Sequence, residues 1–183
     1  MTKVSMILAA VAVVVIGGFA FRSFADNTNA SIPQVGQQAP EFTLPSVKGG
    51  DVSLDQYRGK WVVLYFYPKD MTSGCTMEAH NFEQDLSRYQ AVNAVVVGVS
   101  VDSIKSHKEF CAKDSLTFTL LSDTDKKVVA EYGSLGVYGP YKIANRNTFL
   151  INPEGKIVKV WTKVDPAHHS QQVLAELHSL EKH

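Results

Sequence analysis

The chain has 183 residues, of which 45% are hydrophobic and 20% charged, so it can bury one substantial core and cannot be wholly disordered. Eighteen basic residues balance 18 acidic ones, and the sequence pI is about 7.0. This balance excludes a strongly basic nucleic-acid-binding surface. The two cysteines, Cys75 and Cys111, are too few for a disulfide-rich scaffold or a four-cysteine zinc site. They must act singly or as one pair.

The N-terminal segment is expected to lie outside the folded domain. Residues 4–21 carry no charge, and as a helix they would be roughly 27 Å long, close to the hydrocarbon thickness of a bilayer. We therefore assign residues 1–25 to a signal peptide or membrane anchor. Residues 26–37 are polar and interrupted by proline and glycine, which is typical of a linker. The domain is expected to occupy residues 38–183.

Both fates of the apolar segment stay open. Ser23 and Ala25 are small residues that suit cleavage before Asp26, but Arg22 lies close to that site, and the apolar run is longer than in most signal peptides. A cleaved segment would release the domain, and an uncleaved one would tether it to the inner membrane. In either case we expect an exported protein on the periplasmic side.

The rest of the chain alternates short apolar runs with stretches of helical periodicity. The predicted strands are residues 42–44, 52–54, 61–67, 94–101, 118–121, 148–151 and 157–161. The predicted helices are residues 75–89, 103–113, 126–132 and a last helix that opens at Asp165-Pro166, an N-cap followed by proline. This order predicts an α/β fold with a central mixed sheet flanked by helices.

The loop that follows the apolar run Trp61–Tyr67 is the first candidate for a functional site, because such sheets place their sites after central strands. It ends at Cys75, where a helix is predicted to begin. Unpaired backbone N–H groups and the helix dipole stabilise an anion there, such as a thiolate. Thr72 can donate a hydrogen bond into the same pocket, and Pro68 can shield one side from water. A small core cysteine is the alternative interpretation of Cys75.

Two other cysteine chemistries fit less well. A C-x-x-C dithiol is excluded because position 78 is Glu78. A cysteine–histidine pair is possible from composition, but His80 is expected to point away from the helix N-terminus.

The segment Tyr65–Ala79, YFYPKDMTSGCTMEA, resembles the active-site segment of peroxiredoxins, and in particular the Q-type group, also called bacterioferritin comigratory proteins. The P-x-x-x-T-x-x-C core is specific, and the resemblance extends over roughly residues 35–180. It includes the segments 99–103, 121–123 and 146–151. The resemblance implies a thioredoxin-like fold and a thiol peroxidase that reduces hydrogen peroxide and organic hydroperoxides. We expect no cofactor and no metal.

The resemblance also implies roles for five side chains. Cys75 matches the peroxidatic cysteine, whose thiolate attacks the O–O bond and becomes a sulfenic acid. Thr72 matches the hydroxyl that orients the peroxide, and Pro68 matches the residue that shields the sulfenic acid. Arg146 matches the arginine that stabilises the thiolate and the developing alkoxide, and Glu78 matches the acid that holds it. A solvated glutamate and a surface arginine are the alternatives.

The sequence departs from the Q-type pattern at two positions. Ser73 stands where proline is more usual, and His80 stands where many members carry a resolving cysteine. Some members place that cysteine on a later helix, where Cys111 lies. Cys111 shares a helical stripe with Ile104, so a core cysteine is the alternative. We expect an atypical two-cysteine cycle with an intramolecular Cys75–Cys111 disulfide.

Closing that disulfide requires the two Cα atoms to approach within about 4.4–6.8 Å, so we expect the first turn after Cys75 to unwind. The expected reductant is thioredoxin or a thioredoxin-like protein, and the expected state is a monomer or weak dimer that binds no nucleic acid. The competing hypotheses are a one-cysteine peroxidase resolved by an external thiol and a non-enzymatic redox-sensing module on the same fold.

Overall fold

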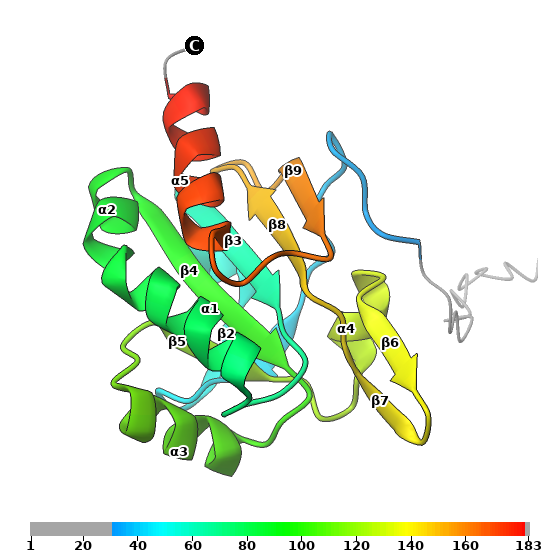
Figure 1. Ribbon diagram of the computed structural model, residues 1–183. Helices are drawn as coiled ribbons and strands as arrows, with labels where there is room; N and C mark the ends of the chain where they lie inside the picture. The colour runs from blue at the N-terminus through cyan, green and yellow to red at the C-terminus, as the bar shows by residue number, and fades with distance from the viewer. Residues whose placement is uncertain (1–30, 182–183) are drawn as a thin grey trace, which may run out of the picture.

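The computed structural model describes residues 31–181 (Figure 1). The segment 1–25, assigned from the sequence to a signal peptide or anchor, lies outside the described residues. Within residues 31–181, no helix has the length and apolarity needed to cross a membrane. Gly36 and Gln37 already exchange backbone hydrogen bonds with Ile157, so the chain joins the sheet just before residue 38.

Strands and helices follow one another in α/β order. The strands are β1 (Thr43–Pro45), β2 (Asp51–Ser53), β3 (Trp61–Phe66), β4 (Ala94–Ser100), β5 (Thr119–Ser122), β6 (Leu135–Tyr138), β7 (Tyr141–Ala144), β8 (Asn147–Ile151) and β9 (Ile157–Thr162). The helices are η1 (Leu54–Tyr57), α1 (Ser73–Gln84), α2 (Leu86–Ala91), α3 (Ile104–Asp114), α4 (Lys127–Glu131) and α5 (His169–Leu180). The predicted strands over residues 42–44 and 52–54 correspond to β1 and β2, which pair in an antiparallel hairpin.

The central sheet is mixed and has β3 in its middle. Its strand order is β5-β4-β3-β8-β9; β3 pairs in parallel with β4, and β4 with β5, whereas β8 is antiparallel to both β3 and β9. Every residue of β3 after Trp61 is buried, which explains its unbroken apolar run. The loop that follows β3 therefore leaves the sheet at its centre.

Each face of the sheet carries its own apolar cluster, because successive side chains of β3 point to opposite faces. Tyr65 lies on the face that α1, α2, α3 and α5 cover, with Phe82 of α1 and Phe110 of α3 in the same cluster. Phe66 lies on the other face, which α4, η1 and the β1–β2 hairpin cover. Figure 1 shows α1 and α5 in front of the sheet. This is the thioredoxin-like α/β fold that the sequence predicted.

Two predicted helix boundaries are wrong. The helix expected over residues 75–89 is broken at Asp85, whose backbone (φ −89°, ψ 0°) departs from α geometry and whose carboxylate binds Arg88 and Ser170. The last helix begins at His169 instead of at Asp165-Pro166. Asp165 accepts a hydrogen bond from the Ala167 N–H and so caps the turn that precedes the helix.

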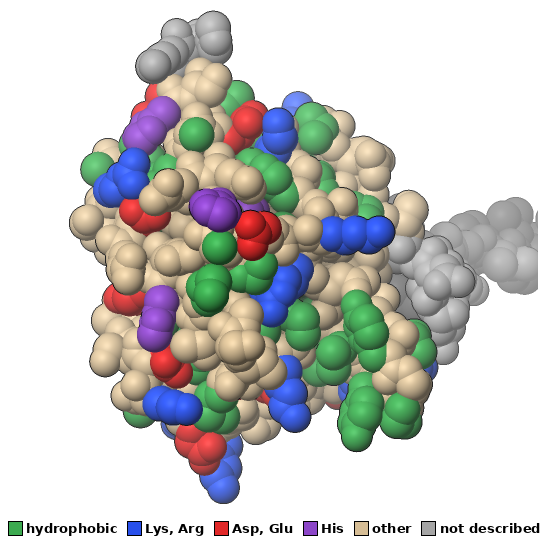
Figure 2. Space-filling model, viewed as in Figure 1, with side chains coloured by type: hydrophobic (Ala, Val, Ile, Leu, Met, Phe, Trp, Pro, Cys, Tyr) green, Lys and Arg blue, Asp and Glu red, His purple; other side chains and the backbone are tan. Residues whose placement is uncertain are grey.

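The β6–β7 hairpin is not predicted from the sequence, because its strands have four residues each and meet at Gly139-Pro140. Gly139 has a φ of 61°, which suits this tight connection. Val137, Tyr138 and Tyr141 expose their apolar side chains on it, and Figure 2 shows hydrophobic side chains gathered over this hairpin.

Candidate active site

The junction of the β3–α1 loop and α1 holds a buried thiol. Thr72 is the N-cap of α1 with extended backbone angles (φ −84°, ψ 149°), and Cys75 is the third residue of the helix. The Cys75 side chain is a free thiol, and the residue is 2% exposed. Cys75 therefore lies at a helix N-terminus, as the sequence predicted, where backbone N–H groups favour an anion.

Arg146 reaches this thiol from the neighbouring strand. It directly precedes β8, whose first residue, Asn147, pairs with Phe66 at the carboxyl end of β3. Its Nη2 donates a hydrogen bond to Cys75 Sγ at 3.1 Å, and its Nη1 donates to Glu78 Oε2 at 2.5 Å. The Glu78 side chain is 1% exposed, so the alternative of a solvated glutamate is wrong. The guanidinium thus joins Cys75 and Glu78.

Gly74 makes room for this guanidinium. A Cβ atom at position 74 would lie 2.9 Å from Arg146 Nη2, closer than carbon and nitrogen approach without a shift. A side chain at Gly74 would therefore displace Arg146 from Cys75.

The carboxyl group of Glu78 is only half paired. Oε2 accepts from Arg146, whereas Oε1 has no hydrogen-bond partner among the described residues. Burial raises the pKa of Glu78 to about 7, although Arg146 acts in the opposite direction. Burial also disfavours the charge on Arg146, but the sulfur of Cys75 and the carboxylate of Glu78 outweigh it and raise the pKa of the guanidinium. The site therefore holds a permanent cation, Arg146, whose charge Glu78 neutralises only in part.

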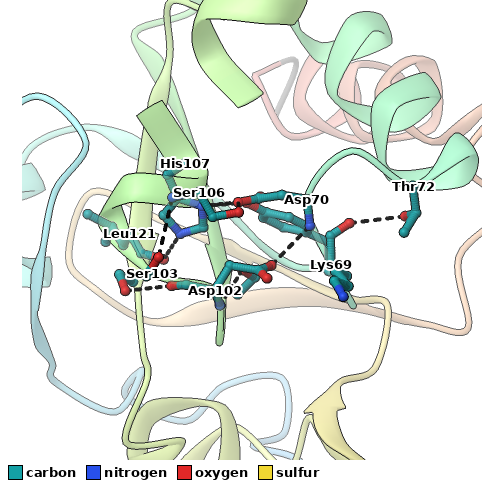
Figure 3. Close-up of polar contacts among 11 residues, drawn as sticks. Lys69, Asp70, Thr72, Asp102, Ser103, Ser106, His107 and Leu121 are labelled. Carbon is teal, nitrogen blue, oxygen red and sulfur yellow. Dashed lines mark hydrogen bonds and ion pairs between the residues drawn. The ribbon is translucent and has the colours of Figure 1, made fainter. Parts of the chain in front are cut away.

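Thr72 and Pro68 border the same loop. The Thr72 hydroxyl donates to the carbonyl of Lys69 at 3.0 Å (Figure 3), and not into the pocket of the thiol as predicted. Its oxygen lone pairs stay available as acceptors. Within residues 31–181 no hydrogen bond joins Thr72 to Cys75. Pro68 is half-buried and lies two residues after the end of β3.

A second polar cluster, which was not predicted from the sequence, holds this loop against α3 (Figure 3). Asp70 is 3% exposed, and its carboxylate accepts from the hydroxyls of Tyr67 and Ser106, both at 2.7 Å, and lies 2.8 Å from His107 Nδ1. Its backbone N–H donates to Asp102 Oδ2 at 2.9 Å. Burial alone would raise the pKa of Asp70, but the contacts from His107, Ser106 and Tyr67 outweigh it and lower that pKa.

His107 completes this cluster. Its Nε2 lies 3.1 Å from the Leu121 carbonyl oxygen, and its Nδ1 faces the Asp70 carboxylate. Both of these oxygens are acceptors, so each contact is a hydrogen bond only if the ring nitrogen facing it carries a hydrogen. Asp70 and His107 then form a buried ion pair that ties the loop to α3. The sequence contains only a weak signal for this cluster: an acid, Asp70, shortly after a buried strand, and a single histidine, His107, on a helix that carries apolar residues.

Cys111 is a half-buried free thiol on α3. Burial, and then the nearby carboxylates of Asp70 and Glu83, raise its pKa to about 11, so it is a neutral thiol near pH 7. Within residues 31–181, no cluster of three or more histidine, cysteine, aspartate and glutamate side chains is arranged to ligate a metal.

A buried thiol at a helix N-terminus with an arginine on its sulfur, carried on a thioredoxin-like sheet, defines a thiol-based redox protein. Residues 35–160 match the AhpC/TSA family. The putative peroxiredoxin bcp of Coxiella burnetii is 47% identical over 148 residues, which cover 79% of this chain and 98% of the relative. The peroxiredoxin Bcp of Bacillus subtilis is 40% identical over 148 residues, 79% of this chain and 94% of the relative.

Solved structures agree with these relatives. A cysteine-to-serine mutant of Xylella fastidiosa PrxQ superposes with a TM-score of 0.78 and 34% identity, covering 83% of this chain and 99% of that one. Two cysteine-to-serine mutants of Xanthomonas campestris peroxiredoxin Q give TM-scores of 0.73 at 36% identity, covering 83% of this chain and 98% and 99% of those. The chain belongs to the AhpC/TSA family, and within it to the peroxiredoxins, which are thiol peroxidases.

Proposed function

We propose that this peroxiredoxin reduces hydrogen peroxide and organic hydroperoxides with Cys75 as its peroxidatic residue. The contact of Arg146 Nη2 with Cys75 Sγ at 3.1 Å carries the proposal, because it places a permanent cation on the nucleophile. The Cys75 thiolate attacks one peroxide oxygen, so an S–O bond forms as the O–O bond breaks. The leaving oxygen takes up a proton and departs as water or an alcohol. Arg146 stabilises both the thiolate and the charge that develops on the leaving oxygen.

The neighbouring side chains position these two groups. Glu78 holds the second guanidinium nitrogen and so orients Arg146 toward the sulfur. Because the Thr72 hydroxyl donates its hydrogen bond to the Lys69 carbonyl, its oxygen is free to accept a hydrogen bond from the O–H group of an incoming hydroperoxide. Pro68 offers no N–H at the mouth of the loop and shields the sulfenic acid.

The sulfenic acid is resolved by Cys111 in an intramolecular cycle. The sulfur of Cys111 attacks the sulfur of Cys75; the S–S bond forms, the S–O bond breaks, and the hydroxyl leaves with the thiol hydrogen as water. The two Xanthomonas campestris mutants replace cysteines at positions 36 residues apart, the separation of Cys75 and Cys111 here, which supports this pairing. Thioredoxin or a thioredoxin-like protein then reduces the disulfide.

Mass spectrometry without reductant, after one equivalent of peroxide, tests the cycle. We expect the peptides of Cys75 and Cys111 to be linked with the loss of two hydrogens. Formation of only a mixed disulfide with an added small thiol would favour a one-cysteine peroxidase. Failure to consume peroxide would favour a redox-sensing module and overturn the proposal.

We also propose that residues 1–25 export the domain, with or without cleavage. The support is the uncharged run of residues 4–21. A reporter fused after Ser31 should be active only outside the cytoplasm, and activity confined to the cytoplasm would contradict export. An extracytoplasmic location would make a thioredoxin-like protein of that compartment the reductant.

A further inference from the structure

The segment that carries Cys75 is attached to α3 and its following loop at both of its ends. At the N-terminal end, the Asp70 carboxylate contacts Ser106 and His107 of α3. At the C-terminal end, His80 Nε2 lies 3.1 Å from Asp114 Oδ1, the last residue of α3. The residues between these attachments are 71–79, and Cys75 is the central one.

A second contact strengthens the C-terminal attachment. The carboxylate of Glu83 accepts hydrogen bonds from the Thr117 backbone N–H at 2.7 Å and from the Thr117 hydroxyl at 2.5 Å. Glu83 lies one turn after His80 on α1, and Thr117 lies three residues after Asp114. One side of α1 is therefore joined to the end of α3 over a full helical turn.

Cys111 lies between the two attachments on α3. His107, Cys111 and Asp114 are spaced four and three residues apart, which places them on one face of the helix. The residues beside this stripe, Lys108, Glu109, Ala112 and Lys113, are exposed. The stripe therefore faces the protein, with the second thiol between the two points that hold the ends of the Cys75 segment.

The start of the segment, residues 71–73, is exposed and makes few side-chain contacts. The N-cap residue, Thr72, makes no side-chain hydrogen bond to the first turn of α1, a contact that typically contributes about 0.5–2 kcal/mol. Met71 has a φ of 58°, an unfavourable backbone conformation for a residue with a side chain. Ser73 and Met77 are exposed. Opening can therefore begin at the first turn of α1, although it must then break the contacts of Arg146 with Cys75 and Glu78.

We propose that the contacts at Asp70, His80 and Glu83 are anchors that stay in place while the segment opens, and that they confine Cys75 to the neighbourhood of Cys111. Cys75 lies five positions along the chain from Asp70 and five from His80, so the extended chain on each side of it can span about 17 Å. Along the axis of α3, Cys111 lies only about 6 Å from His107 and about 4.5 Å from Asp114. The sulfur of Cys75 can therefore reach Cys111 without release of either anchor.

The anchors act on the resolving step and not on the reaction with peroxide. They shorten the free chain that must close, which raises the effective concentration of Cys111 at the sulfenic acid. This inference rests on the proposed Cys75–Cys111 disulfide and adds what guides its formation. His80, which stands where other members carry a resolving cysteine, thereby has a function of its own.

The test removes both C-terminal contacts in the double variant His80→Ala/Glu83→Ala. The matched control is His178→Ala/Glu181→Ala, which makes the same two changes at the same spacing, at exposed positions at the end of α5. Each protein receives one equivalent of hydrogen peroxide, is quenched with an alkylating agent at successive times, and is analysed by mass spectrometry for sulfenic acid and disulfide. Milder variants, His80→Gln and Glu83→Gln, serve if the double variant does not fold.

We expect the first oxidation of Cys75 to keep its rate in the anchor variant, while disulfide formation slows by about threefold for each doubling of the free chain. The control should match the wild type in both steps. Faster disulfide formation would mean that the contacts keep α1 closed instead of guiding Cys75 to Cys111. An unchanged rate would mean that the contacts affect neither opening nor guidance. Either result would overturn the proposal. If the wild type itself forms no Cys75–Cys111 disulfide, the proposed cycle fails instead.

Discussion

Two buried acids flank Cys75, five residues before it and three residues after it, and their hydrogen bonding is very different. Asp70 receives three side-chain contacts, one from Tyr67 just after β3 and two from Ser106 and His107 of α3, and its pKa is lowered. Within residues 31–181, the Glu78 carboxylate has one hydrogen-bond partner, Arg146, which also contacts the sulfur of Cys75, and its other oxygen has none; its pKa is raised to about 7.

The difference separates a group that fixes the chain from a group that serves the chemistry. The Asp70 carboxylate, which is already contacted by Tyr67, Ser106 and His107, has little capacity for another partner, so Asp70 suits an anchor. An incompletely neutralised arginine can interact with a further anion at little cost, and in the proposed mechanism that anion is the Cys75 thiolate or the developing alkoxide. Polar groups that are left partly unsatisfied in a buried site are often found where function requires them.

The largest effect is expected at the thiol between the two acids. Cys75→Ser should abolish peroxide turnover, because a serine hydroxyl does not form the nucleophilic anion that the site stabilises. Peroxide consumption with a thioredoxin system measures this. Cys111→Ser is the control, since it should keep the first turnover and lose only the disulfide. Substantial turnover by Cys75→Ser would remove the assignment of the active site.

As pH rises, the ionisation of the two acids should change the free energy of unfolding in opposite directions. The folded-state pKa of Glu78, about 7, lies above its ordinary value of 4.5, so the native state binds the extra proton and stability falls as pH rises from about 4.5 through 7. Glu78→Gln should remove that fall, which amounts to at most about 3 kcal/mol. Urea unfolding of the reduced protein at a series of pH values measures it, and an identical slope in variant and wild type would contradict it.

For Asp70 the sign is reversed. Its folded-state pKa lies below 3.8, so its stabilising contribution is complete above pH 3.8 and is lost as pH falls through the lowered value. Asp70→Asn should therefore be less stable than the wild type at neutral pH, and its stability should depend less on pH below about 4. A variant that loses stability on acidification as steeply as the wild type would contradict the ion pair with His107.

The smallest expected effect lies in the loop between the acids. Ser73 is the first residue of α1, and the extended backbone of Thr72 before it is what a proline at position 73 requires. Ser73→Pro should stabilise the closed segment by about 0.4–1 kcal/mol, and so slow disulfide formation about two- to fivefold. The first oxidation of Cys75 should keep its rate. The same quenched time course measures both steps, and acceleration of the disulfide would show that opening does not limit it.

The parts of the molecule that depend on local pattern could be predicted from the sequence. The apolar run of β3 and the loop-to-helix change at Cys75 are signals contained within a few residues, and they indicate both the sheet and the nucleophile. The partnership of Arg146 with Glu78 joins residues 68 positions apart, and it was expected only because the surrounding segments resemble peroxiredoxins.

The rest depends on how elements dock, which no local pattern contains. Asp70 and His107 are 37 residues apart, and they meet only because α3 packs beside the loop after β3. The hydrogen bond of the Thr72 hydroxyl was expected in the pocket but goes to the Lys69 carbonyl for a similar reason, since the fold of the loop decides which acceptor is near. The break at Asp85 likewise arises from the contact with Ser170 of α5, 85 residues away.

The reaction of Arg146→Ala with peroxide tests the contrast between the two acids most directly. The measurement is the rate of a single oxidation of Cys75 across pH, with Cys111→Ser as the common background and Asp70→Asn as the comparison. The account predicts a loss of about 10²–10³-fold and an altered pH–rate profile for Arg146→Ala, by analogy with the removal of an oxyanion-hole donor, and a much smaller loss for Asp70→Asn. An unchanged rate and profile in Arg146→Ala, or an equal loss in both variants, would contradict it.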